Sequence, residues 1–404
     1  MRIATANAFD NTIAQLTRRQ ADLAKQQERL SSGKQVLKPS DDPVAATLAE
    51  TAKNKLARNE ADLRALKASR TSLEQVESGL GESSDLIQQV RELFVTAGNG
   101  AFTDSEREDV ARQLEGLRER LIAVANRADT NGRTLFGGLG GSSTPFVDTY
   151  TASGATVVFQ GQRGQAAAGN TSLPSTLDGD AIWMRVPQGN GTFTVSLGAG
   201  NTGSVRTDMG EVSNLSAVTG DAYQIAFADV GGQMQYSITN TTTGLPVAGQ
   251  TGMPYQSGQT IAFDGLSLTL KDGPAAGDTV DINPVSAPTD LFKVVQNAID
   301  ALRVTGTGAN AQRTQALTQS LTELDSAHDR VLLARGRAGE WLNRADSLDS
   351  LLGDRSAALK IEKSSLEDLD LIQGISDFQT QQTALDAAIK AYAQVQKLSL
   401  FSAI

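Results

Sequence analysis

The chain has 404 residues, enough for two or three domains, and its 39% hydrophobic content can support folded cores. Its net charge of -10 argues against a nucleic acid or an anionic membrane as partner, because both would need clustered Lys and Arg. Cysteine is absent, which excludes disulfides, zinc-thiolate sites and thiol nucleophiles.

The N-terminal segment, residues 1–32, is predicted to be a coiled-coil helix. It lacks the apolar core of a conventional secretion signal, and no apolar run in the sequence is long enough to span a membrane, so we expect a soluble protein. One position of its seven-residue repeat is apolar throughout: Phe9, Leu16, Leu23 and Leu30. The other position is half polar: Ile13, Gln20 and Gln27. So narrow a seam needs a partner, since packing must offset the cost of helix nucleation.

A joint is predicted directly after this helix. Gly33 follows the last seam residue as a helix stop, and Pro39 prevents easy continuation. Asp42 is the expected N-cap of the next helix, with Pro43 at its first position. We expect Asp41 to face the positive end of the same helix dipole.

Two helical segments then form the first half of a rod, residues 33–137. The first runs from Pro43 to about Ala97, and the second follows Thr103 to about residue 127. Thr103 with Glu106 has the spacing of a capping box. Composition then changes to Gly, Thr, Ser and Val in short alternating runs, which predicts an all-β insertion over residues 138–285, with a hairpin turning at Gly231-Gly232.

Helix returns over residues 286–366, with a break at 306–308, and residues 367–404 repeat the pattern of the first helix. One heptad position holds Leu371, Phe378, Leu385 and Tyr392. The other holds Ile375, Gln382, Ile389 and Gln396. The predicted fold class is α+β: a long antiparallel helical bundle or coiled coil built from both termini, with an inserted all-β domain.

Candidate chemistry is sparse. His328 lies near Asp325 and Asp329 on a predicted helix, where such a group is usually a solvated surface pair. A metal at the Asp41-Asp42 pair is less favoured than capping, and the stretch Leu177 to Ala181 (LDGDA) is expected to be a turn. We expect no enzyme activity, no cofactor and no metal.

The stretch LSSG at residues 30–33, followed by Asp41-Asp42 before a long helix, resembles the bacterial flagellin superfamily. Residues 88–100 are similar to the segment before the second flagellin helix, and residues 391–401 to the last helix. A further element of the returning helix also matches, at Arg335, Gly339, Asn343 and Arg344. Pro43 after the aspartates and the ending LSLFSAI resemble the members at the hook-filament junction more than filament flagellin.

This resemblance implies a structural subunit that joins hook to filament and assembles through its terminal helices into a tube. It implies self-assembly with neighbouring copies, contacts with the hook-proximal junction protein and with filament flagellin, and an export chaperone on the C-terminal helix. The expected location is extracellular, in the bacterial flagellum, after export through the flagellar secretion channel. Two alternatives stay open: a filament flagellin, or a helical-stalk adhesin whose β module binds glycans through exposed aromatic residues.

Overall fold

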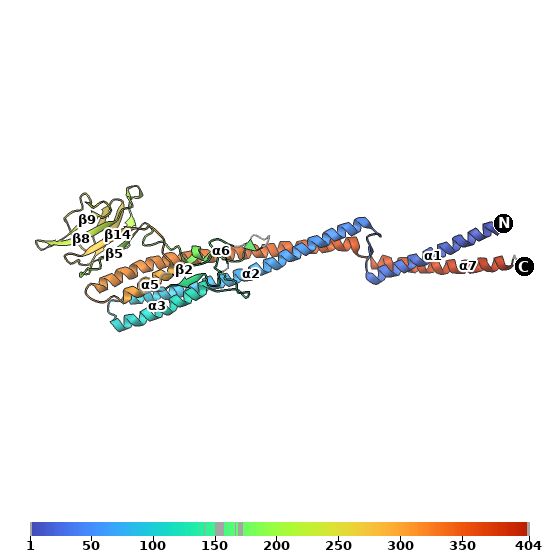
Figure 1. Ribbon diagram of the computed structural model, residues 1–404, viewed down its shortest axis with the longest axis horizontal. Helices are drawn as coiled ribbons and strands as arrows, with labels where there is room; N and C mark the ends of the chain where they lie inside the picture. The colour runs from blue at the N-terminus through green and yellow to red at the C-terminus, as the bar shows by residue number, and fades with distance from the viewer. Residues whose placement is uncertain (1, 141, 150–156, 166, 169–172, 402–404) are drawn as a thin grey trace. The chain divides into compact units, whose positions relative to one another are not determined.

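The computed structural model describes the chain except residues 1, 141, 150–156, 166, 169–172 and 402–404 (Figure 1). The side chains of residues 2–9, 167–168 and 395–401 also lie outside the described part. The chain divides into two compact units. We call residues 1–64 with 347–404 the terminal unit, and residues 65–346 the central unit.

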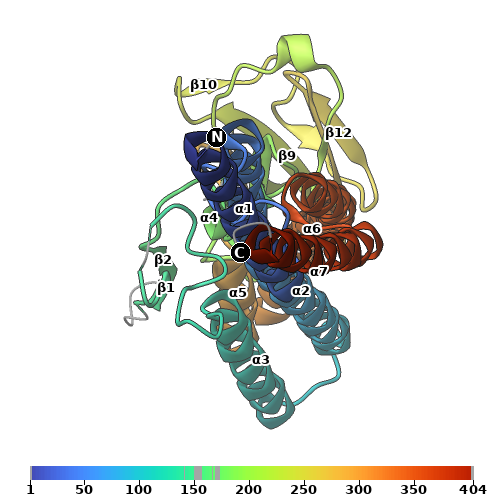
Figure 2. The same cartoon turned by 90° about the vertical axis from the view of Figure 1, so that its right-hand side faces the viewer.

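The terminal unit consists of helices. Helix α1 (Arg2–Ser32) and helix α7 (Leu371–Phe401) run antiparallel and in contact, with the chain ends on the same side (Figures 1 and 2). The first turns of α2 (Pro43–Ala97) and the last turns of α6 (Ala309–Glu367) complete the unit. Asn59 of α2 is buried, and its side-chain amide donates to the carbonyl of Leu352 of α6 at 2.8 Å.

The helical part of the central unit is built from α2, α3 (Asp104–Ala125), α5 (Leu291–Leu302) and α6. Their apolar faces meet in one core, whose fully buried members include Leu80, Phe94, Leu121 and Phe292. Helix α3 begins with the predicted capping box, because the Thr103 side chain accepts from the Glu106 amide and the Glu106 carboxylate accepts in return.

Several short elements after α3 pack on this helical core. They are β1 (Phe146–Asp148), β2 (Val157–Phe159), β3 (Ala167–Ala168), β4 (Leu173–Pro174) and α4 (Gly179–Trp183). Trp183 is fully buried against Phe136 and Phe146, with ring centroids 4.6 and 5.4 Å away. This part of the predicted β insertion therefore shares the core of the helices.

The rest of the insertion is a sandwich of two antiparallel sheets with its own core. The larger sheet has the order β10-β9-β8-β14-β5, with β11 also paired to β9: β5 (Phe193–Leu197), β8 (Tyr223–Val230), β9 (Gln233–Asn240), β10 (Leu245–Pro246), β11 (Met253–Pro254) and β14 (Thr279–Pro284). The smaller sheet is centred on β13: β6 (Arg206–Thr207), β7 (Glu211–Val212), β12 (Thr260–Phe263) and β13 (Leu266–Lys271). Strands β8 and β9 form the hairpin predicted at Gly231-Gly232, with Val230 opposite Gln233.

Two local expectations are wrong. The stretch predicted as a turn, LDGDA, forms the start of the five-residue helix α4, because the Asp178 side chain accepts from the Ala181 amide as an N-cap. His328 is not a surface partner of the neighbouring aspartates. Its Nε2 lies 2.7 Å from the Ser84 hydroxyl of α2.

No helix in the described ranges is both long enough and apolar enough to cross a membrane.

Candidate functional site: the terminal helix pair and its joint

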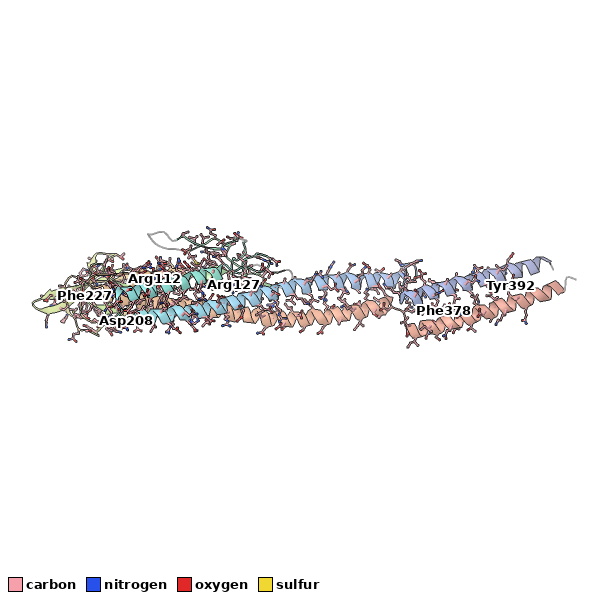
Figure 3. The ribbon with its side chains drawn as sticks, turned by 90° about the horizontal axis from the view of Figure 1, so that it is seen from below. Arg112, Arg127, Asp208, Phe227, Phe378 and Tyr392 are labelled. Atoms are coloured by element: carbon pink, nitrogen blue, oxygen red, sulfur yellow. The ribbon has the colours of Figure 1, made fainter. Side chains whose placement is uncertain are left out.

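The contact between α1 and α7 uses one of the two predicted heptad positions. On α1, Leu16, Leu23 and Leu30 are half-buried. On α7, Leu385 is buried, and Phe378 and Tyr392 are half-buried (Figure 3). The side chain of Phe9 lies outside the described residues. This position of the repeat pairs the two ends of the chain, as a coiled-coil seam does.

The other predicted position is not part of this contact. Ile13, Ile375 and Ile389 are exposed, by 44 to 49%. Leu371, which the heptad pattern places in the first position, is also exposed, by 53%. Polar and small residues on the opposite flank take their place: Gln26 is buried, and Gln381 and Ala388 are half-buried. The expected seam is therefore only half used within one chain, and a second apolar line stays open to solvent.

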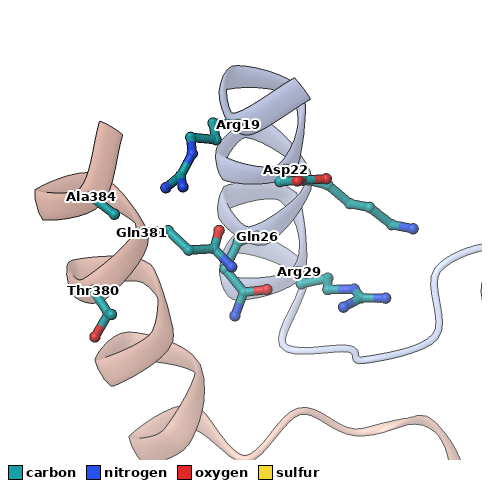
Figure 4. Close-up of a pocket in the computed structure, with 8 residues that line it drawn as sticks. Arg19, Asp22, Gln26, Arg29, Thr380, Gln381 and Ala384 are labelled. Atoms are coloured by element: carbon teal, nitrogen blue, oxygen red, sulfur yellow. The ribbon is translucent and has the colours of Figure 1, made fainter. Parts of the chain in front are cut away.

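Gln26 and Gln381 form a polar layer between the two helices (Figure 4). Together with Arg19 and Arg29 they line a hollow of 580 Å³. The Gln26 side-chain amide donates to the Gly374 carbonyl at 3.3 Å. Among the residues described, Gln381 Oε1 and Arg29 Nε are buried without a hydrogen-bond partner. Buried polar groups without a partner cost stability, so this layer stabilises the pair less than an apolar layer would.

Gly374 of α7 is closely packed by two leucine side chains, one of them from α1. A Cβ atom placed there would lie 2.9 Å from Leu369 Cδ2 and 3.2 Å from Leu30 Cδ2. A larger residue would have to push these side chains apart.

The joint ends α1 and starts α2 as the sequence predicts. Gly33 follows the last helical residue with φ of +68°, a conformation that glycine adopts without strain. The Asp42 carboxylate accepts from the amides of Val44 and Ala45 at 3.0 and 2.9 Å, which makes it the N-cap of α2. Pro43 is the first helical residue, and Pro39 lies exposed in the connection.

Asp41 has another role than expected. Its carboxylate lies 2.7 Å from the Lys25 ammonium of α1. It also accepts from the amides of Lys38 and Leu37 at 3.2 and 3.3 Å. The hydrogen bond from Lys25, helped by that from Lys38, lowers the pKa of Asp41 to about 2. The first aspartate thus fastens the joint to α1, and the second starts α2.

The two connections of the terminal unit are tied to each other. Lys34 forms an isolated antiparallel bridge with Asp368, and the Gln35 amide donates to the Glu367 carbonyl at 2.8 Å. The Leu369 amide donates to the Gly33 carbonyl at 2.9 Å, and Lys34 Nζ pairs with the Glu367 carboxylate at 2.9 Å. The segment between α1 and α2 and the segment between α6 and α7 are therefore held together by hydrogen bonds and form one joint.

The terminal unit has little core of its own. Neither hydrophobic core cluster of the described residues contains a residue of this unit. Among its described residues it nevertheless carries nine exposed large hydrophobic side chains: Ile13, Val44, Leu48, Leu351, Ile361, Leu371, Ile372, Ile375 and Ile389. Exposed apolar surface of this extent marks an interaction surface.

Known proteins share this arrangement. A family model described as the bacterial flagellin N-terminal helical region matches residues 3–140. The flagellar hook-associated protein 3 of Escherichia coli is 28% identical, with 99% of each chain covered. A flagellin of Clostridium tyrobutyricum is 21% identical, with 96% of this chain and 97% of the flagellin covered. The crystal structure of hook-associated protein 3 of Legionella pneumophila superposes with a TM-score of 0.69 at 27% identity, covering 78% of this chain and 97% of that one.

Over residues 3–140 the chain is similar to the N-terminal helical region of the bacterial flagellins. Its long terminal helices, long central helices and central antiparallel β domain match the fold of the Legionella pneumophila protein. Within the superfamily, the chain resembles hook-associated protein 3 over its whole length.

Proposed function

We propose that the chain is a structural subunit of the bacterial flagellum that joins hook to filament. Its partners are neighbouring copies of itself, the hook-proximal junction protein and filament flagellin. The observation that carries the proposal is the terminal unit, which exposes nine large hydrophobic side chains and has no core cluster among the described residues. The full-length similarity to hook-associated protein 3 supports the same assignment.

The terminal helices assemble the tube through their second apolar line. The first line, through Leu16, Leu23, Phe378 and Leu385, joins α1 to α7 within one chain. The second, which includes Ile13, contacts neighbouring copies and removes its apolar surface from water. Because the polar layer keeps the pair weak, the terminal unit gains most of its stability on assembly.

The alternatives are less well supported. A filament flagellin would share the assembly mode, but the flagellin of Clostridium tyrobutyricum is less similar than hook-associated protein 3. A glycan-binding adhesin needs exposed aromatic rings. Tyr223 and Tyr236 are each 2% exposed, Trp183 is fully buried, and Tyr255 packs edge-on against Phe227 at 5.5 Å. These aromatic side chains build cores instead.

The proposal includes no catalytic activity and no cofactor, in keeping with relatives that are structural flagellar proteins. It also includes no nucleic-acid or membrane partner. The chain is exported through the flagellar secretion channel and acts outside the cell. During export, a chaperone covers α7, whose exposed Leu371, Ile372 and Ile375 would otherwise associate too early.

Deletion of the gene tests the proposal in a motile host. We expect cells that build hooks and secrete flagellin into the medium but retain no filaments, and expression of the chain in trans restores filaments. Loss of flagellin itself from the medium would point to the filament alternative. Filaments of normal number and length without the chain would contradict both.

A further inference from the structure

The β sandwich and the helices of the central unit have separate hydrophobic cores. The core of the sandwich runs from Phe193 to Ile282, and the helical core includes Val186 and Leu291 on either side of it. In the described part of the chain, no buried apolar residue belongs to both clusters. The sandwich nevertheless lies beside the first turns of α6 (Figure 1). Something other than a shared apolar core must orient it.

Helix α6 presents a polar face to the sandwich. Its members recur at helical spacing of three or four residues: Gln312, Gln315, Gln319 and Glu323. Gln315 is 4% exposed and Glu323 only 1%, which is unusual for such residues unless they are paired.

Gln315 is hydrogen-bonded to the edge of the smaller sheet. Its side-chain oxygen accepts from the Thr207 amide at 2.9 Å, and its side-chain amide lies 2.9 Å from the Thr207 hydroxyl. Both ends of the glutamine therefore bind one residue of strand β6.

Glu323 binds the segment that enters the sandwich. Its carboxylate accepts from the Gly189 amide at 2.9 Å and from the Gln319 side chain at 2.8 Å. One turn before Gln315, Gln312 donates to the carbonyl of Ala199 at 3.3 Å.

The backbones approach closely at the start of the same helix. A Cβ atom at Gly308 would lie 2.2 Å from the Asn201 carbonyl oxygen, and the φ of Gly308 is +75°. Hydrogen bonds depend on direction as well as distance, whereas apolar contacts do not. A row of buried hydrogen bonds is therefore suited to fixing an angle between two bodies.

We propose that this polar face of α6 sets the orientation of the β sandwich on the helical core, with Gln315 and Glu323 as its positioning residues. The inference concerns the central unit and does not depend on the proposed function. Loss of these hydrogen bonds frees the sandwich to reorient while both cores stay folded, because neither core includes them.

The test uses the full chain, which has no cysteine and accepts two spin labels without background. Exposed Gln113 of α3 and Ala262 of β12 are changed to cysteine and labelled. The variants are Gln315→Leu, which keeps volume but removes the hydrogen bonds, together with Glu323→Ala and Glu323→Gln. Gln89→Leu on the exposed face of α2 is the matched control. Tryptophan fluorescence monitors the helical core around Trp183.

We expect one narrow distance distribution for the unaltered pair and for Gln89→Leu. Gln315→Leu and Glu323→Ala broaden or shift it, with unchanged tryptophan emission, and Glu323→Gln restores it because the amide oxygen still accepts from Gly189. A distribution that stays narrow in Gln315→Leu and Glu323→Ala would overturn the proposal, because packing rather than hydrogen bonding would then set the angle.

Hydrogen exchange of the unaltered chain gives a second test that needs no variant. The amides of Thr207 and Gly189 are the donors to Gln315 and Glu323. We expect them to exchange at least about tenfold faster than the core amides of Ile225 and Val280, because undocking leaves the cores intact. Exchange of all four at one common rate, set by global unfolding, would contradict the proposal.

Discussion

Replacing the exposed isoleucines of α7 should abolish assembly without unfolding the subunit. Ile372, Ile375 and Ile389 are 85, 49 and 44% exposed. Their exposed parts together amount to roughly two whole side chains, and burial of one isoleucine contributes about 1.5 to 3 kcal/mol. Changing all three to glutamine should therefore remove about 3 to 5 kcal/mol of association free energy per subunit, a loss of affinity of roughly 10²- to 4 × 10³-fold. Unfolding of the free chain should change by only about 0.5 kcal/mol per site.

The assay is the ratio of chain bound to flagella to chain secreted into the medium, measured in a deletion strain that expresses each variant. The triple variant should be secreted and remain in the medium. A matched control changes three exposed apolar residues of the sandwich to glutamine: Leu215, Val230 and Leu245. The control should be retained on flagella. Normal retention of the α7 variant would refute the role of the second apolar line.

Three further predictions concern stability. Gly374→Val should separate α1 from α7 and cost about 1 to 3 kcal/mol, seen as faster hydrogen exchange in α7, whereas Gly353→Val, where a Cβ meets no atom within 4 Å, should preserve the pair. Because the pKa of Asp41 is lowered to about 2, the joint should be stable above pH ~4 and open as pH falls towards 2, a step that Asp41→Asn should remove. Burial raises the pKa of Asp290, the N-cap of α5, from 3.8 to about 6. The free energy of unfolding should therefore fall by about 3 kcal/mol as pH rises from ~4 to ~6, and it should level off at higher pH. Asp290→Asn should flatten this slope, measured by denaturation at a series of pH values.

The sequence predicted the features that depend on neighbouring residues. The Asp42 cap, the capping box at Thr103 and the stop at Gly33 are each complete within a few residues, and the structure confirms them. The break between α5 and α6 at Gly306–Gly308 is local in the same way.

Features that join distant segments were missed or misplaced. The heptad count placed Ile375 and Ile389 in the same seam as Phe378, but α1 packs on the other flank of α7, against Gln381. An apolar pattern shows that a residue needs a partner and not which partner it has, and α7 carries apolar residues both toward α1 and on its exposed side. Asp41 was assigned to the nearer helix because its bond to Lys25 spans sixteen positions of sequence.

The polar face of α6 is visible in the sequence as a row of polar residues, but the sequence alone did not predict its burial. Gln315 and Glu323 recur at helical spacing, yet polar residues on a helix are normally read as its solvated side. Their burial depends on contact with the β sandwich, which is distant in sequence. Thr207, the partner of Gln315, lies more than a hundred positions before it.

Hydrogen exchange of α1 and α7, compared between the free chain at micromolar concentration and the chain assembled on flagella, tests the central claim most directly. The claim is that the terminal unit is incomplete until neighbouring copies cover its second apolar line. We expect fast exchange of both helices in the free chain and strong protection after assembly. Equal and strong protection of both helices in the free chain would contradict the account.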